Sequence, residues 1–245
     1  MRKLILAAST LFTVGMSHAN NQVPLIVDTG TGLRPTISVT ICSPTDASIC
    51  KTIDKIIVDT GSSGLHISDS ALDMPGDKDS LRKALLLAKN ANGTMVGQCN
   101  QYVSSYTWGT LKLATVKLGD DTVSSAPVQI IGGSNPGVVP TACAVGTANT
   151  DGYGSGTNGL IGASSVGLDY GQYYACPATG CTGMEEQDLS KTQKAVLASG
   201  VWDSAKQKAS PINMSPQTLL KNNNNGVILD LPAIPPAGAP HAEGT

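Results

Sequence analysis

Short runs rich in Val, Ile and Thr recur along this chain of 245 residues, and clusters of turn residues separate them. Such runs favour extended strands, because β-branched side chains pack well on a pleated surface. Five of these runs are Val23–Val27, Thr36–Ile41, Ile53–Val58, Thr110–Leu118 and Pro127–Ile131. With 27 Gly and only 14% charged residues, the composition excludes a coiled coil. The pattern predicts a mainly β fold, a closed barrel or a sandwich, with a few short helices.

Two segments have apolar residues at helical spacing. We expect one helix over Ser80–Asn90, with Asp79 as its N-cap. We expect a second over Ser190–Ser199, with Gly200 as its stop signal.

The N-terminus has the pattern of a secretory signal peptide. Arg2 and Lys3 make it positive, an apolar run over Leu4–Val14 follows, and small residues surround Ala19. The run is too short to span a bilayer. We therefore expect residues 1–19 to be removed and the protein to be exported to the periplasm or secreted, without stable membrane insertion. The alternative for this run is a buried N-terminal strand.

Six cysteines follow the predicted cleavage site, and an even number in an exported chain predicts three disulfides. Six cysteines allow 15 pairings, and the sequence does not choose among them. Proximity along the chain favours the pairs Cys42–Cys50, Cys176–Cys181 and, as the remainder, Cys99–Cys143. The alternative is zinc ligation, but no two cysteines have C-x-x-C spacing, so we expect no metal.

The charge balance limits the possible partners of the protein, and the composition of the C-terminus indicates where the lobe ends. A formal net charge of −2 gives no basic surface for nucleic acid. The stretch Gly154–Gly159 fits a Gly-rich nucleotide motif, but no strand precedes it and no helix follows it, so we expect no cofactor. We expect one lobe over residues 20–231, and a Pro-rich linker over 232–245 that leads towards a missing second lobe.

The segment Ile56–Ile67 carries the strongest indication of chemistry. Apolar residues lead into Asp59, a Thr-Gly-Ser-Ser turn follows, and a second apolar stretch leaves. A general base needs a carboxylate held rigidly at the end of a buried strand and oriented by neighbouring hydroxyl groups. We therefore expect Asp59 to be catalytic, with Thr60, Gly61 and Ser62 as its turn and with Ser62 donating a hydrogen bond to the carboxylate. The alternative is a solvated turn between two strands.

This segment resembles the active-site loop of the pepsin-like and retropepsin-like aspartic peptidases, Asp-Thr/Ser-Gly followed by Ser/Thr. The resemblance implies an acid-protease lobe and hydrolysis of a peptide or protein substrate. It assigns Asn158–Gly162 to a strand that passes through the active-site turn, and places Tyr102, or else Tyr106, on a flap over the substrate. His66 stands where such enzymes usually have Trp, so we expect it near the substrate, either bonded to Tyr102 or at the surface. The alternatives are an ordinary buried strand and aromatic residues that merely pack a hairpin.

A smaller family is more similar over nearly the whole chain. The similarity rests on the Cys42–Cys50 loop and on Val58–Leu65, Tyr106–Gly109, Tyr173–Cys176 and Asn224–Ile228. These segments resemble an uncharacterised bacterial exported family, the domain-of-unknown-function family 3443. Its members look like pepsin-fold proteins without an established substrate, so the resemblance supports fold and export more than activity.

A second catalytic carboxylate is missing from the pattern. Aspartic peptidases use two carboxylates about 3 Å apart that share one proton. No aspartate after Asp59 stands in another apolar-apolar-Asp-Thr/Ser-Gly segment. Asp28 lies in its own Asp-Thr-Gly, but it is too close to Asp59 along the chain for a separate lobe, and Arg34-Pro35 interrupts its exit. We interpret Asp28 as a turn at a strand end.

Three hypotheses follow. The first is an exported aspartic-peptidase-like hydrolase, of which this chain holds one lobe and is inactive alone. The second is a peptide- or protein-binding module that kept the fold and lost the pair of acids. The third is a retropepsin-like homodimer, in which two copies of Asp59 meet across a two-fold axis.

Overall fold

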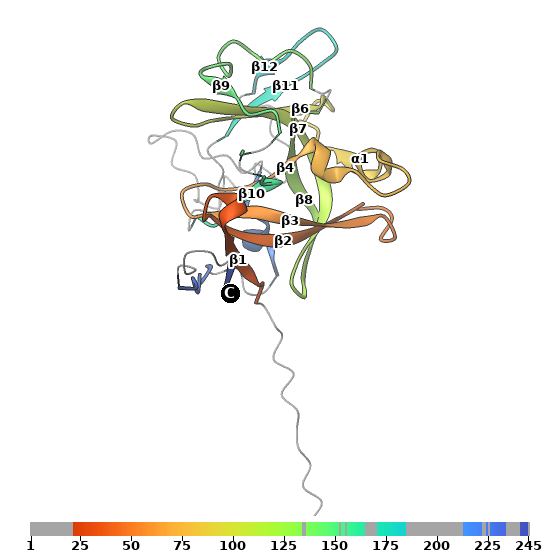
Figure 1. Ribbon diagram of the computed structural model, residues 1–245. Helices are drawn as coiled ribbons and strands as arrows, with labels where there is room; N and C mark the ends of the chain where they lie inside the picture. The colour runs from red at the N-terminus through yellow and green to blue at the C-terminus, as the bar shows by residue number, and fades with distance from the viewer. Residues whose placement is uncertain are drawn as a thin grey trace, which may run out of the picture.

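The structure, a computed structural model, describes residues 22–133, 136–151, 153–154, 156–164, 171–184, 213–221, 224, 226–233 and 241–244 (Figure 1). The predicted signal peptide 1–19 and the predicted helix Ser190–Ser199 lie outside these residues. The described chain is mainly β. The strands are β1 Leu25–Asp28, β2 Pro35–Cys42, β3 Cys50–Asp59, β4 Leu65–Ser68, β5 Leu86–Leu87, β6 Val96–Gln101, β7 Ser105–Leu118, β8 Asp121–Ile131, β9 Thr147–Ala148, β10 Gly159–Gly162, β11 Gln172–Ala175, β12 Thr182–Gly183 and β13 His241–Gly244. The helices are α1 Ser80–Ala84 and the 3-10 turns η1 Thr29–Thr31, η2 Asp69–Leu72 and η5 Pro216–Leu219.

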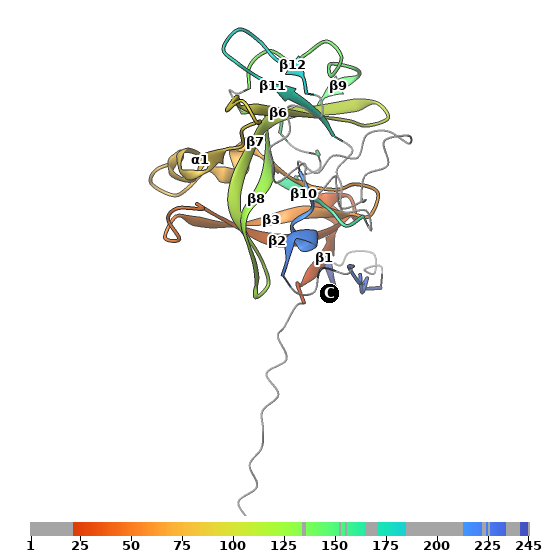
Figure 2. The same cartoon turned by 180° about the vertical axis from the view of Figure 1, so that it is seen from behind.

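All strands belong to one sheet of 13 strands. Its main order is β12-β11-β6-β7-β8-β4-β10-β3-β2-β1-β13, and β5 and β9 also pair with β7. β7 pairs with β2 as well, so the path through β8, β4, β10, β3 and β2 returns to β7. In Figures 1 and 2, β6, β11 and β12 lie at one end of the molecule, β1 to β3 lie at the other, and β7 and β8 connect them.

β7 is the reason why the prediction of a closed barrel or a sandwich needs correction. Along one edge, Tyr106–Thr110 pairs with β6, Lys112 and Leu113 pair with β5, and Thr115–Lys117 pairs with β2. A strand of 14 residues is long beside the usual five or six, so one edge serves three partners. The result is one large sheet that continues past β7 at one end and past β2 at the other.

The main hydrophobic core lies against β2, β3, β4, β7 and β8. Ile41, Ile53, Leu65 and Ile67 are among its most deeply buried members. Burying one such side chain contributes roughly 1.5–3 kcal/mol. β10 adds Ile161 to the same core. The packing that stabilises the sheet therefore also fixes the strand that passes beside Asp59.

The predicted helix over Ser80–Asn90 is wrong beyond Ala84, where α1 ends. Leu85 is extended, with φ −73° and ψ 132°, and the next two residues form β5. Pairing with β7 therefore outweighs the helical spacing. Asp79 makes no side-chain cap; its carboxylate binds Arg82 instead.

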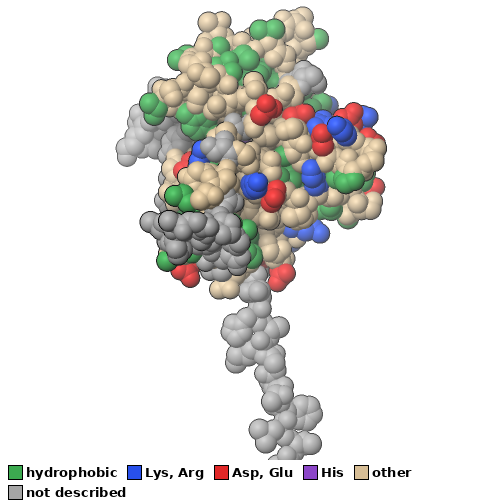
Figure 3. Space-filling view, viewed as in Figure 1, with side chains coloured by type: hydrophobic (Ala, Val, Ile, Leu, Met, Phe, Trp, Pro, Cys, Tyr) green, Lys and Arg blue, Asp and Glu red, His purple; other side chains and the backbone are tan. Residues whose placement is uncertain are grey.

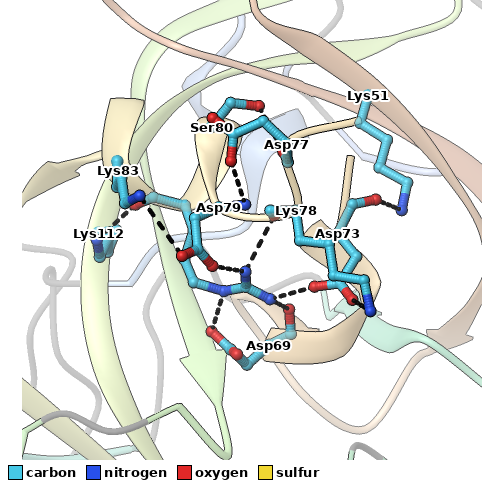
Figure 4. Close-up of polar contacts among 10 residues, drawn as sticks. Lys51, Asp69, Asp73, Asp77, Lys78, Asp79, Ser80, Lys83 and Lys112 are labelled. Atoms are coloured by element: carbon cyan, nitrogen blue, oxygen red, sulfur yellow. Dashed lines mark hydrogen bonds and ion pairs between the residues drawn. The ribbon is translucent and has the colours of Figure 1, made fainter. Parts of the chain in front are cut away.

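Arg82 of α1 binds Asp69 of η2 and so holds the two elements together. Figure 4 labels the three aspartates that surround its guanidinium, Asp69, Asp73 and Asp79. This guanidinium donates to Oδ1 of Asp69 at 2.8 Å, of Asp73 at 2.6 Å and of Asp79 at 2.8 Å. The hydrogen bond from Arg82 keeps the pKa of the Asp73 carboxyl below its usual range. Lys112 donates to the carbonyl of Arg82, and its burial lowers the pKa of its ammonium. Charged side chains on the face in Figure 3 gather mainly around α1.

The three predicted disulfides are confirmed, with the pairing that proximity favoured. Cys42–Cys50 joins β2 to β3, Cys99–Cys143 ties β6 to the loop before β9, and Cys176–Cys181 spans the turn between β11 and β12. Within the predicted linker 232–245, His241–Gly244 forms β13 and pairs antiparallel with β1.

Candidate functional site

Asp59 is the last residue of β3. The three apolar residues before it are buried, whereas Asp59 is half-buried and Thr60 is exposed. The N–H of Gly61 donates to Oδ1 of Asp59 at 3.0 Å. The structure thus places Asp59 where the sequence predicted it, as a carboxylate at the end of a buried strand.

β10 passes through the loop that follows Asp59. It runs parallel to β3 and antiparallel to β4, so it lies between the two strands that the loop connects. Gly162 is level with Asp59, and its N–H donates to the carbonyl of Gly64 at 2.8 Å. The N–H of Ala163 donates to the carbonyl of Asp59 at 2.7 Å. The path predicted for Asn158–Gly162 is confirmed.

Position 162 must be glycine, because β10 passes very close to the backbone of the loop at this point. A Cβ at this position would lie 2.2 Å from the Cα of Ser63 and 2.4 Å from the carbonyl oxygen of Ser62. Both contacts are with backbone, which has no free end to move aside. The strand therefore fits through the loop only with glycine at this point.

The hydrogen bond predicted from Ser62 to the Asp59 carboxylate is not present. Ser62 Oγ is buried and has no hydrogen-bond partner among the described residues. Its carbonyl is engaged instead, because it accepts from the N–H of Ser164 at 3.1 Å. The backbone of Gly61, rather than a hydroxyl group, orients the carboxylate.

Tyr102 lies at the turn of the hairpin formed by β6 and β7. Its hydroxyl oxygen is 2.8 Å from that of Tyr153, and the two rings meet edge to face with centroids 5.6 Å apart. Tyr106 instead packs against the cluster around the Cys99–Cys143 disulfide. Of the two tyrosines proposed for a flap, Tyr102 is the one whose ring contacts lead back towards the Asp59 loop.

His66 is only 1% exposed, which corrects the prediction that it contacts a substrate directly. Its Nδ1 lies 2.8 Å from Oε1 of Gln129, and its Nε2 lies 3.0 Å from the carbonyl oxygen of Ser63. The predicted hydrogen bond with Tyr102 is also wrong, because Gln129 and Ser63 engage the two ring nitrogens. Tyr153 lies edge to face with both His66 and Tyr102. His66 supports the Asp59 loop from inside the protein.

A buried network of uncharged polar side chains surrounds His66. Asn100 Nδ2 donates to Gln129 Oε1 at 3.0 Å, and Gln98 Nε2 donates to the hydroxyl of Tyr173 at 3.0 Å. Asn213 Nδ2 donates to Gln98 Oε1 at 2.9 Å. Buried polar groups are costly unless they are paired, so a network of this kind fixes the relative positions of its members.

The segment 213–217 also stabilises the loop. Asn213 accepts from the N–H of Leu65 at 3.4 Å and donates to its carbonyl at 3.3 Å, as a neighbouring strand would. Ser215 Oγ accepts from the N–H of Gly64 at 2.8 Å. Gln217 Nε2 donates to the carbonyl of Gly162. Three side chains of one short segment thus hold both the loop and the strand within it.

The two Asp-Thr-Gly segments lie level with each other. β1 and β3 are both antiparallel to β2, and Thr36 of β2 pairs with both Ile26 and Ile57. In this register Asp28 and Asp59 stand at the same height on parallel strands, with β2 between them. Two strand spacings amount to about 9.6 Å between the two backbones.

Over residues 17–245 the chain matches the model of a family described as protein of unknown function (DUF3443). The chain belongs to this family. A search of the curated proteins gives no match. In the described part of the DUF3443 chain, no helix has the length and apolar character needed to cross a membrane.

Several residues that shape the site in this DUF3443 chain have only weak signals in its sequence. Tyr153 stands between two glycines in a Gly-rich stretch, where a lone aromatic residue has no periodic partner. Gln98 and Gln129 lie within strands and resemble ordinary polar strand residues. Asn213 and Ser215 come well over a hundred residues after the loop that they contact, so no local pattern connects them to it.

Proposed function

We propose that this DUF3443 protein is an exported aspartic-peptidase-like protein with a pepsin-like lobe, and that Asp59 is one of two carboxylates that activate a water molecule for peptide hydrolysis. The observation that carries the proposal is the loop after Asp59, through which β10 passes with Gly162 level with the carboxylate. This arrangement fixes a carboxylate at an open strand end while leaving it half-buried rather than sealed in.

The chemistry requires a partner for Asp59. One ionised carboxylate takes a proton from the attacking water, while a protonated one donates a hydrogen bond to the carbonyl of the scissile peptide. The proposal does not assign this role to Asp28, because Arg34 and Pro35 follow it where Asp59 has an apolar exit. In this proposal the second carboxylate comes from a further lobe or from a second copy of the chain.

Export is part of the proposal and has two supports. The first is the N-terminal pattern of a signal peptide over residues 1–19. The second is the set of three disulfides, because such bonds persist in oxidising compartments. Together they favour a protein that works in the periplasm or outside the cell.

One observation favours a second candidate function, a non-catalytic module that binds extended peptides. Ser62 Oγ lies in the loop yet makes no hydrogen bond to Asp59 among the described residues. A catalytic carboxylate is usually oriented by such neighbours, and binding alone would not need that orientation. In this alternative the loop would be a scaffold for a peptide-binding surface.

Turnover of a quenched fluorescent peptide library between about pH 3 and pH 7 tests the proposal. We expect no cleavage by a monomer of residues 1–245, and cleavage where Asp59 meets its second carboxylate, in a protein that includes the further lobe or in a dimer of this chain. That cleavage should be blocked by a statine-type inhibitor and should fall about a thousandfold or more in Asp59→Asn, because the general base is lost. Asp28→Asn is the matched control, since it removes the carboxylate of the other Asp-Thr-Gly, and it should keep most of the activity.

Different results separate the candidates. Peptide binding that persists in Asp59→Asn, without turnover in either protein, supports the binding module. Turnover that appears only when sedimentation shows a dimer supports a pair of Asp59 residues from two copies. Absence of both turnover and peptide binding across the pH range, in the protein with the further lobe and in the dimer, overturns the proposal.

A further inference from the structure

The chain contains the pair Asn-Gly at Asn92, at Asn158 and at Asn225. In such a pair the main-chain nitrogen of the glycine can attack the side-chain amide carbon of the asparagine, because glycine has no Cβ to hinder the approach. The reaction needs an unrestrained side-chain amide, a backbone that can change its conformation, and room for a five-membered ring. The pairs at Asn92 and Asn158 differ in all three respects, and Asn225 lies outside the described residues.

Asn92 and Gly93 lie at the exposed tip of the turn that leads into β6. The side-chain amide of Asn92 makes no hydrogen bond to another described residue. Gly93 has a φ of 79°, and no atom lies within 4 Å of the place that a Cβ would take. The N–H of Gly93 donates to the carbonyl of Asn90 at 3.1 Å, and a single bond in an exposed turn opens at little cost.

Asn158 and Gly159 are held on every side. Nδ2 of Asn158 donates both to the carbonyl oxygen and to Oδ1 of Asp54, each at 3.0 Å. Its own carbonyl accepts from the N–H of Ser68 at 2.9 Å. Gly159 is buried in β10, where a Cβ would lie 2.2 Å from the carbonyl oxygen of His66. Ring closure at Asn158 would therefore require β10 to leave the sheet.

We propose that Asn92 is a site of spontaneous deamidation in the folded protein, through the main-chain nitrogen of Gly93, and that the fold protects Asn158. The nitrogen of Gly93 loses its proton to hydroxide and forms a bond to Cγ of Asn92. The bond from Cγ to the side-chain nitrogen breaks, and this nitrogen takes up a proton and leaves as ammonia. Water then opens the cyclic imide at either carbonyl, which gives aspartate or isoaspartate. This modification does not depend on the proposed peptide hydrolysis.

The products change the turn in two ways. Both place a carboxylate in a stretch that has no charged residue between Lys89 and Lys112. Isoaspartate also adds one atom to the main chain between Asn90 and Thr94. These two residues close the turn, because the N–H of Asn90 donates to the carbonyl of Thr94 at 2.9 Å and Oδ1 of Asn90 accepts from the N–H of Thr94 at 2.9 Å. We therefore expect isoaspartate to disturb the entry into β6.

Peptide mapping of the full chain during incubation at mildly alkaline pH tests the proposal. Mass spectrometry follows the conversion of amide to acid at each pair, and an isoaspartate methyltransferase labels the isoaspartate. In the folded protein we expect Asn92 to react at least about tenfold faster than Asn158, because only the reaction at Asn158 requires a strand to leave the sheet. In guanidinium chloride with the disulfides reduced, the two rates should agree within about threefold. Equal rates in the folded protein, or the same ratio in the unfolded chain, would overturn the proposal.

Asn92→Gln separates this site from Asn90 and Asn100, which lie in the same peptide between Lys89 and Lys112. Glutamine would have to close a larger ring, so we expect deamidation of that peptide to fall at least about tenfold in the folded variant. Asn158→Gln is the matched control and should leave the rate at Asn92 unchanged. Melting curves check that both variants are folded; if Asn158→Gln is not, the comparison of folded and unfolded wild type decides. Deamidation of the peptide at the wild-type rate in Asn92→Gln would overturn the assignment.

Discussion

The chain contains Asp-Thr-Gly twice, at Asp28 and at Asp59, and the two copies stand level on parallel strands. After Asp59 the chain turns into β4, and β10 fills the space between β3 and β4. After Asp28 the chain enters the 3-10 turn η1 and then β2. The same tripeptide is therefore followed by two different structures.

The difference teaches that the tripeptide does not build the loop by itself. The Asp59 loop depends on a buried apolar exit strand, on glycine at position 162 and on the side chains of Asn213 and Ser215. Arg34 and Pro35 follow the first copy where the second has its apolar exit. Contacts that are distant in sequence decide which copy is a candidate site.

The largest expected effect comes from Gly162→Ala, which blocks the passage of β10 through the loop. Because the new Cβ would overlap backbone atoms, we expect the free energy of unfolding to fall by about 4 kcal/mol or more. The matched control is Gly156→Ala, beside the first Asp-Thr-Gly, where φ is 65° and the nearest atom, the carbonyl oxygen of Gly30, is 3.5 Å away. It should cost roughly 1–2 kcal/mol. Denaturant unfolding measures both, and equal losses would contradict the difference between the two copies.

Asn213→Ala removes the side chain that lies along Leu65 and should have the next largest effect. Three buried hydrogen bonds are lost, so we expect a loss of about 2–4 kcal/mol in the free energy of unfolding. Thr31→Ala is the counterpart near Asp28, where the hydroxyl donates to the carbonyl of Arg34 at 3.2 Å, and it should cost about 1 kcal/mol. A larger loss in Thr31→Ala would show that the first copy is the better supported of the two.

Tyr102→Phe tests the aromatic contact that leads towards the Asp59 loop. Loss of one hydroxyl pair that is only partly buried should cost about 1 kcal/mol or less. A double-mutant cycle with Tyr153→Phe should give a coupling energy of at least about 0.5 kcal/mol. Additive effects would mean that the two hydroxyl groups do not interact in solution.

The smallest expected effect is on stability at low pH, and it comes from the contact between Arg82 and Asp73. The hydrogen bond from Arg82 lowers the pKa of Asp73 from the ordinary 3.8, so the folded state binds this proton less readily than the unfolded state. Its stabilisation is complete above that ordinary value and is lost as the pH falls through the lowered pKa. Melting temperatures should therefore drop less steeply below about pH 4 in Asp73→Asn than in the wild type. Parallel curves would contradict this assignment.

The sequence predicted local features well because their causes are local. The runs of β-branched residues predicted the main strands, and the short spacing of Cys42 and Cys50 predicted their disulfide. The apolar residues before Asp59 predicted its place at a strand end. Each of these depends on residues that lie within about ten positions of one another in the chain.

Features that depend on distant contacts were missed or wrong. The helix expected to continue to Asn90 gives way to β5, because β7 offers it a pairing edge. His66 was expected near the substrate, either bonded to Tyr102 or at the surface, but Gln129 and Ser63 engage its ring inside the protein. The sequence also gave no reason to connect Asn213 with Leu65. Such contacts follow from the packing of the whole sheet and not from any short pattern.

The passage of β10 between β3 and β4 has a consequence for the synthesis of the protein. On the ribosome, Asp59 emerges about a hundred residues ahead of Gly162, which takes on the order of 5–20 s at ordinary rates of synthesis. During that interval β3 and β4 lack the strand that separates them. Whatever activity the loop supports is therefore withheld from every nascent chain until its later part has been made and inserted.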